Sequence, residues 1–315
     1  MGLVPRSEDA AALCERFFDS PVTTIARFLT GLANYVYDVV LTDGRNVVAR
    51  IAVEENRRQI EGGIFWSGVL RRIGVPLPAL LFADAKGDPF AYMVPERLPG
   101  TDLANIYDGL SLEQKQTLAE QLAEIQDRVG GQPLGRGYGF VSQLDDPAVH
   151  RTWRSVLDAT LARAYERVES VPGVEVNRLR RIEAALAHED GYLSAVAPRA
   201  FLDDITTKNV IIDAGRLTGI VDVDEICFGD PLFTLGLTRM SLLARGRQVD
   251  YIDDWVNILE LNARQLRILD LYTAIHCTTF IGELGQRFNK DAVSPIDRGE
   301  VNRLLEIFDG LLSDH

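Results

Sequence analysis

The sequence contains few cysteines and no long hydrophobic run, and each absence excludes a class of protein. Cys14, Cys227 and Cys277 lie far apart, are odd in number and show no metal-ligand spacing, which argues against a zinc centre or a disulfide framework. A reducing cytoplasm is therefore the expected location. No uncharged apolar run is long enough to cross a membrane, so we expect neither a membrane partner nor a secretory signal.

Histidines are also few, and basic residues are fewer than acidic ones. The four histidines are scattered and form no zinc or catalytic-triad pattern. The 33 basic residues are outnumbered by 46 acidic ones, which gives a net charge of −13, and nucleic acid is not expected as a partner because its phosphates bind basic surfaces. The acidity suits a cationic small-molecule partner, or it serves only solubility.

What the sequence does have is the composition of a globular protein with an ample core. Apolar residues make up 46% and charged residues 25% of the 315 residues, and this length allows one large domain or two moderate ones. Residues 1–7 resemble the remnant of a protease tag and are given no structural weight. We find no internal repeat and no low-complexity tract.

The secondary-structure pattern changes near residue 100. Before it, helices are expected over residues 8–19 and 54–73, the second weakened by glycines. Strands are expected at 24–29, 35–41, 46–52, 79–84 and 90–95. After it, long helices are expected at 111–129, 149–170, 176–188, 231–246, 249–285 (more than one) and 297–313. We predict a β-rich lobe over 1–98 and a mainly helical lobe over 99–315.

A β-hairpin interrupts the helical part. The apolar run Val210-Ile211-Ile212 is followed by an Asp/Gly-containing turn and by the returning strand that ends at Val221. Folding back places Asn209 beside Asp222, with Asp204 within reach, and these oxygen donors suit Mg²⁺. A metal held beside a spare carboxylate is what phosphoryl transfer needs. An incidental polar loop is the alternative.

Two further patterns point to phosphate. The small residues of the loop from Gly31 to Asn34 let backbone N–H groups approach phosphate oxygens. Arg50, on the third expected strand, is a candidate phosphate ligand, with Glu61 on the next helix as its ion-pair partner. A half-exposed basic side chain is the alternative for Arg50, and Glu54, Glu55 and Gln59 compete for the pairing role.

In their order and spacing, these pieces resemble the aminoglycoside phosphotransferase family from about residue 20 to beyond 240. The segments that carry the resemblance are Leu29-Thr30-Gly31-Leu32-Ala33-Asn34, Asp43 to Ile51, Gly74-Val75-Pro76-Leu77-Pro78, Glu96-Arg97-Leu98-Pro99-Gly100, Leu202 to Asn209, Gly219-Ile220-Val221-Asp222 and Gly229-Asp230-Pro231. The resemblance implies a protein-kinase-like, two-lobe α/β (α+β) fold.

The resemblance also implies roles for individual residues. Asp204 matches the catalytic aspartate, and Asn209 and Asp222 match the Mg²⁺ ligands. Nucleotide binding falls to the backbone around Glu96 and Leu98 for the adenine, and to Arg50, Glu61, Gly31 and Asn34 for the phosphates. The chain departs from the family pattern at Leu202, where His is usual, at Asp203, where a small residue is common, and at Pro95, which lacks a backbone donor.

We therefore expect an enzyme that transfers the γ-phosphoryl group of ATP or GTP to a hydroxyl of a small molecule, with Mg²⁺ as cofactor. The acidic total, with Asp203, Asp224 and Glu225 close to the site, favours a polycationic acceptor such as an aminoglycoside, and hence antibiotic resistance. Asp224 and Glu225 facing water is the alternative. Another acceptor (a macrolide, peptide antibiotic, choline, sugar or metabolite) and a non-catalytic nucleotide-binding module stay open.

Overall fold

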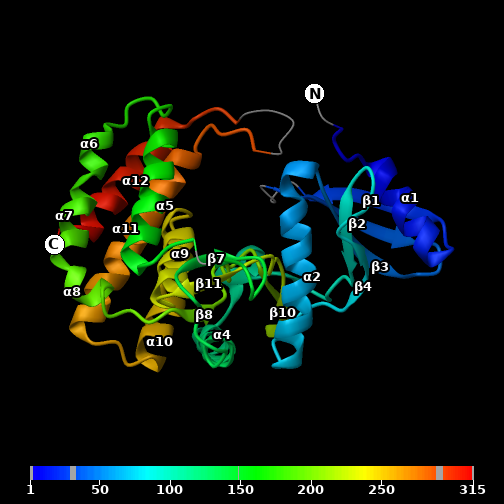
Figure 1. The fold of residues 1–315 in the computed structure, drawn as a ribbon, viewed down its shortest axis with the longest axis horizontal. Coiled ribbons are helices and arrows are strands. Elements are labelled where there is room, and N and C mark those ends of the chain that lie inside the picture. The colour runs from blue at the N-terminus through cyan, green and yellow to red at the C-terminus, as the bar shows by residue number, and fades with distance from the viewer. Residues whose placement is uncertain (1–2, 29–32, 148, 289–293, 314–315) are drawn as a thin grey trace.

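The computed structural model describes residues 3–28, 33–147, 149–288 and 294–313 (Figure 1). Its N-terminal part is built around one antiparallel sheet in the order β1-β2-β3-β5-β4. The strands and the two helices that accompany them are α1 (Ser7–Phe18), β1 (Val22–Phe28), β2 (Tyr35–Leu41), β3 (Asn46–Ala52), α2 (Arg57–Arg72), β4 (Leu80–Asp84) and β5 (Ala91–Pro95).

The two helices cover opposite faces of this sheet. Cys14 on α1 belongs to one buried cluster with Val39 of β2, whereas Ile60 on α2 belongs to another with Met93 of β5. The central strands β3 and β5 are buried along nearly their whole length, as expected for strands that have a helix on each side. In Figure 1, α2 stands between the sheet and the larger C-terminal part.

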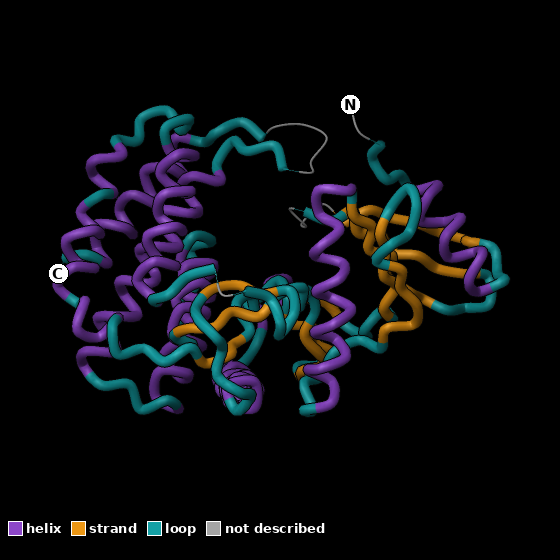
Figure 2. Tube along the Cα trace, in the orientation of Figure 1, coloured by secondary structure: helices purple, strands orange, loops and turns teal. Residues whose placement is uncertain are grey.

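Two small sheets lie in the C-terminal part, beyond Gly100. One has the order β10-β9-β6 and the other the order β7-β11-β8. Their strands are β6 (Thr101–Asp102), β7 (Gly139–Val141), β8 (Arg199–Phe201), β9 (Val210–Asp213), β10 (Arg216–Ile220) and β11 (Ile226–Gly229). These sheets lie beside α2 and carry the loops that form the candidate site (Figure 2).

The rest of the C-terminal part is helical. Its helices are α3 (Leu103–Ile106), α4 (Leu112–Gly130), α5 (Trp153–Val168), α6 (Val176–Leu179), α7 (Arg181–His188), α8 (Asp190–Leu193), α9 (Leu232–Leu243), α10 (Asp250–Ile258), α11 (Ala263–Glu283) and α12 (Arg298–Leu311). The helix α11 is the centre of the packing, because it contacts α5, α9 and α12. Of the helices that the structure describes, none is both long and apolar enough to span a bilayer.

The predicted mixed α/β fold, with a β-rich N-terminal sheet and a helical C-terminal part, is confirmed. The expected helical stretch 249–285 is two helices, because Glu260 has a positive φ of 50° and Asn262 caps the start of α11. The short strands β6, β7, β8 and β11 were not expected. The division into lobes at residue 98 stays a prediction.

Candidate active site

The hairpin β9–β10 brings the two ends of its strands together. Val210 pairs with Ile220, and the backbone N–H of Val221 donates to the carbonyl of Asn209 at 2.9 Å. Asn209 and Asp222 therefore lie beside each other at the open end of the hairpin. Asp222 has a φ of 66°, in the left-handed region that few non-glycine residues adopt, and this turn directs the chain toward Asp224.

The loop from Leu202 to Asn209 holds Asp204 in a defined position. The amide nitrogen of Asn209 donates to the backbone carbonyl of Asp204 at 2.9 Å, which leaves the amide oxygen to face a cation. One carboxylate oxygen of Asp204 accepts from the Thr206 hydroxyl at 2.7 Å. The other lies 2.9 Å from the ammonium of Lys208. The Asp204 side chain is 32% exposed, so it remains accessible to a substrate hydroxyl.

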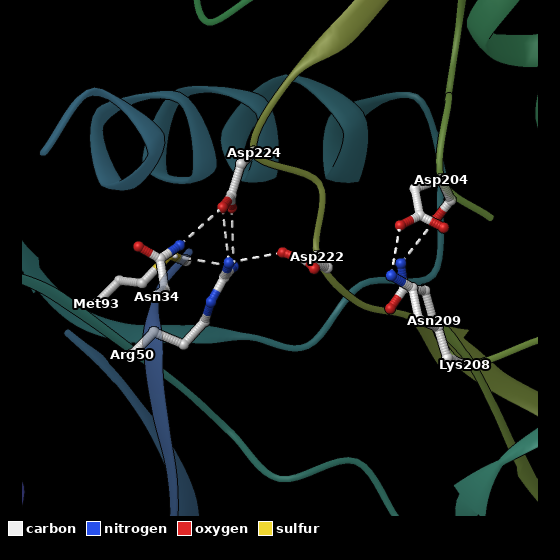
Figure 3. Close-up of polar contacts among 8 residues, drawn as sticks. All are labelled: Asn34, Arg50, Met93, Asp204, Lys208, Asn209, Asp222 and Asp224. Atoms are coloured by element: carbon white, nitrogen blue, oxygen red, sulfur yellow. Dashed lines mark hydrogen bonds and ion pairs between the residues drawn. The ribbon is translucent and has the colours of Figure 1, made fainter. Parts of the chain in front are cut away.

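Arg50 is buried and joins the sheet to the segment between β10 and β11 (Figure 3). Its guanidinium forms two hydrogen bonds with the Asp224 carboxylate, at 2.8 and 2.7 Å, and a third with Asp222 at 2.7 Å. Asn34 donates to the same Asp224 carboxylate at 3.1 Å. Burial opposes the charge of Arg50, but the two carboxylates outweigh it and raise its pKa. We call Asn34, Arg50, Asp222 and Asp224 the Arg50 cluster.

The expected ion pair between Arg50 and Glu61 is replaced by a different one. Arg50 pairs with Asp222 and Asp224 instead, because α2 presents Gly62 and Gly63, rather than an acidic side chain, to this region. Asp224 was expected to face a substrate or water. Its carboxylate is buried in the Arg50 cluster, and burial raises its pKa in spite of Arg50.

Asp203 and Glu225 are two further acids near the loop. Burial, followed by the charges of Asp204 and Glu225, raises the pKa of Asp203 to about 8. Among the described residues, the Oδ1 atom of Asp203 has no hydrogen-bond partner. Glu225 lies 3.5 Å from the Ser142 hydroxyl, and burial raises its pKa too. Their roles in acceptor binding stay predictions.

The residues expected around the adenine have structural contacts of their own. The backbone N–H of Glu96 donates to the carbonyl of Ala79 at 2.8 Å, and its carboxylate accepts from the Ala79 N–H at 2.9 Å. The side chain of Leu98 lies against Gly219 on β10. Gly31 lies outside the described residues. A nucleotide-binding role for these residues stays a prediction.

Sequence reasoning missed Gln126, which supports the loop from a distance. Its side-chain amide on α4 accepts from the Leu202 N–H at 3.0 Å and donates to the Leu202 carbonyl at 2.7 Å. This pair of bonds holds the backbone at the position where the family pattern has histidine. The two residues are 76 positions apart in the sequence, so no local pattern signals the contact. Lys208 was missed as well.

The donor atoms at the end of the hairpin suit a magnesium ion. In the described part of the chain there is no group of three or more His, Cys, Asp or Glu side chains placed to hold a metal, so an all-protein metal cage is not what the site offers. Mg²⁺ is commonly held by one or two protein oxygens together with substrate phosphates. The Asn209 amide oxygen and the 44%-exposed Asp222 carboxylate match that requirement.

The class of protein follows from the family to which the chain belongs. The phosphotransferase enzyme family matches residues 24–269, and the chain belongs to that family. It is a small-molecule kinase. A comparison with curated proteins gave no match.

Solved structures with a similar fold are distant in sequence. A thermostable mutant of aminoglycoside phosphotransferase APH(4)-Ia, in ternary complex with AMP-PNP and hygromycin B, is 16% identical, with 96% of this chain and 97% of that chain covered and a TM-score of 0.65. The GDP and kanamycin complex of APH(2")-IIia is 14% identical, with 98% and 100% covered and a TM-score of 0.69. A protein proposed to be a fructosamine-3-kinase, from Thermobifida fusca, is 16% identical, with 96% and 98% covered and a TM-score of 0.59.

Proposed function

We propose that the protein transfers the γ-phosphoryl group of ATP or GTP to a hydroxyl of a small molecule. The observation that carries the proposal is that Asp204, Asn209 and Asp222 lie around the open end of one hairpin, with Arg50 paired to Asp222. It supplies a base, two metal ligands and a phosphate-binding cation within one site. The AMP-PNP and GDP complexes of similar folds support a nucleotide as the co-substrate.

Each side chain has a defined task in this reaction. Asp204 accepts the hydrogen bond of the acceptor hydroxyl and takes its proton as the hydroxyl oxygen bonds to the γ-phosphorus and the bond to the β-phosphate oxygen breaks. Thr206 and Lys208 fix the orientation of the Asp204 carboxylate. Asn209 and Asp222 would hold Mg²⁺, which neutralises phosphate charge when bound. Arg50 binds phosphate oxygens through its guanidinium.

A cationic acceptor, of the aminoglycoside type, is the first candidate for the second substrate. The net charge of −13 favours it, as do the exposed Glu225 beyond the hairpin and the hygromycin B and kanamycin complexes of similar folds. With such an acceptor the enzyme would confer antibiotic resistance. Another hydroxyl, such as that of a sugar derivative, is the second candidate, and the fold shared with the Thermobifida fusca protein favours it.

Radioactive or mass-spectrometric detection of phosphate transfer across an acceptor panel, with ATP and with GTP, tests the proposal. Asp204→Ala removes the base and should lower turnover by about two to four powers of ten, while nucleotide affinity stays nearly unchanged. The matched control is Asp213→Ala, at the exposed far end of the same hairpin. Equal turnover in Asp204→Ala and Asp213→Ala would remove Asp204 from the mechanism.

A further inference from the structure

Arg50 is held by an acid that does not come from the neighbouring helix. Asp224 follows the hairpin, and both of its carboxylate oxygens accept from the Arg50 guanidinium. This two-point contact is the strongest geometry available between arginine and a carboxylate. Asn34 binds the same carboxylate from the sheet side at 3.1 Å. Arg50 and Asn34 together therefore hold the Asp224 carboxylate within the Arg50 cluster.

Two consecutive glycines on α2 make room for this contact. A Cβ atom at Gly62 would lie 2.1 Å from the backbone oxygen of Asp224, and one at Gly63 would lie 2.7 Å from its Oδ1 atom. A glycine inside a helix destabilises the helix relative to alanine. Neither glycine has a positive φ, in contrast to Gly74 at the end of the helix region. The presence of glycine at positions 62 and 63 is therefore explained by the close approach of Asp224 and not by a backbone conformation that only glycine adopts.

The two acids that contact Arg50 differ in exposure. The Asp222 side chain is 44% exposed, whereas that of Asp224 is 13% exposed. Asp222 is also the carboxylate that the proposed function assigns to the metal. If Asp222 binds a cation in place of Arg50, Asp224 is the acid that still forms an ion pair with Arg50.

We propose that Asp224 is the positioning residue for Arg50, and that it reaches the arginine from the segment between β10 and β11 through the space left by Gly62 and Gly63. The inference rests on the proposed function and specifies one part of it. Asp224 keeps the guanidinium directed at the nucleotide phosphates whether or not Asp222 is engaged elsewhere. Glu61, half-buried on the same helix, does not have this task.

Nucleotide binding to the full chain tests the assignment. Calorimetry with MgATP and MgGTP, with steady-state KM and kcat for the better nucleotide, is applied to wild type, Asp224→Asn, Glu61→Gln and the control Asp213→Asn. We expect Asp224→Asn to raise the nucleotide Kd and KM at least about tenfold and to lower kcat less, because ground-state binding of phosphate is what is lost. A larger loss in Glu61→Gln than in Asp224→Asn would overturn the proposal.

A relocated acid separates positioning from a general structural defect. A Cβ atom at position 63 would lie 2.7 Å from the present Oδ1 of Asp224, so Gly63→Asp in the Asp224→Ala background returns a carboxylate to the same place from the helix. It should recover at least about half of the lost affinity on a logarithmic scale, and Gly63→Asn in that background should not. Equal behaviour of the two double variants would overturn the proposal. Wild-type protein that binds neither nucleotide would overturn the proposed function itself.

Discussion

Replacing Asp203 with asparagine should stabilise the protein, although Asp203 is adjacent to Asp204, the proposed catalytic base. The Asp203 carboxyl is buried, its Oδ1 atom has no hydrogen-bond partner in the described structure, and its pKa is raised to about 8. Ionising such a group inside the fold is unfavourable, because burial and the charges of Asp204 and Glu225 outweigh the attraction of Lys208. Asparagine has nearly the same shape and carries no charge at any pH.

The sign and the size of the effect follow from proton linkage. The folded pKa of about 8 lies above the reference value of 3.8, so between these values the folded state binds more protons than the unfolded state. Wild-type stability therefore falls as the pH rises through this window. The full difference corresponds to about 5–6 kcal/mol at most, and movement of the loop relieves part of it. We expect Asp203→Asn to be at least about 2 kcal/mol more stable than wild type at pH 9.

Urea unfolding of both proteins at pH 5, 7 and 9 measures this difference. The stability advantage of Asp203→Asn should be small at pH 5 and largest at pH 9. Asp250→Asn is a control of opposite sign: burial opposes its charge, but Lys115 and Tyr107 outweigh burial and lower the pKa of Asp250, so this variant should be less stable than wild type at neutral pH. An advantage for Asp203→Asn that does not change between pH 5 and pH 9 would refute the reasoning.

Three other substitutions test the packing and the site. Lys115→Met breaks the 2.9 Å ion pair between buried Lys115 and Asp250 and should lower the free energy of unfolding by about 2–4 kcal/mol, measured with urea at pH 7. Gly229→Ala places a Cβ atom 2.2 Å from the Trp153 ring and should lower the free energy of unfolding by about 1–3 kcal/mol or more. Wild-type stability in Lys115→Met or in Gly229→Ala would contradict the packing described. Lys208→Met removes the ammonium that contacts Asp204, the proposed base, and should lower kcat about tenfold or more with little change in nucleotide Kd. An unchanged kcat would leave Lys208 without a catalytic task.

The hairpin was predictable because its signal is local. Two short β-rich runs and an Asp/Gly turn fix which residues meet at its open end, and Asn209 and Asp222 do lie there. The large sheet and the long helices were predictable for the same reason, since each has its own periodic pattern. The short strand β11 has no such pattern. It is buried throughout and is defined by pairing with β7 and β8.

The partner of Arg50 was not predictable, because it depends on how the sheet and the hairpin dock. Arg50 and Asp224 are 174 positions apart in the sequence, and several acids near Arg50 were equally plausible as partners. The glycines on α2 were interpreted only as weak points of a helix, although their buried positions against Asp224 show close approach. Likewise, Leu202 at the position where the family pattern has histidine gave no sign that Gln126 supports this backbone from α4.

The route by which Asp224 reaches Arg50 affects how distant relatives are judged from sequence. A motif search that requires an acid on the helix after the third strand selects Glu61 here as the partner of Arg50, whereas the partner in the structure is Asp224. Small residues at positions 62 and 63, together with an acid two places beyond the hairpin, form an alternative solution to the same steric problem. Across many chains the two solutions should exclude each other, so bulky residues on the helix should accompany a non-acidic residue at the position of Asp224.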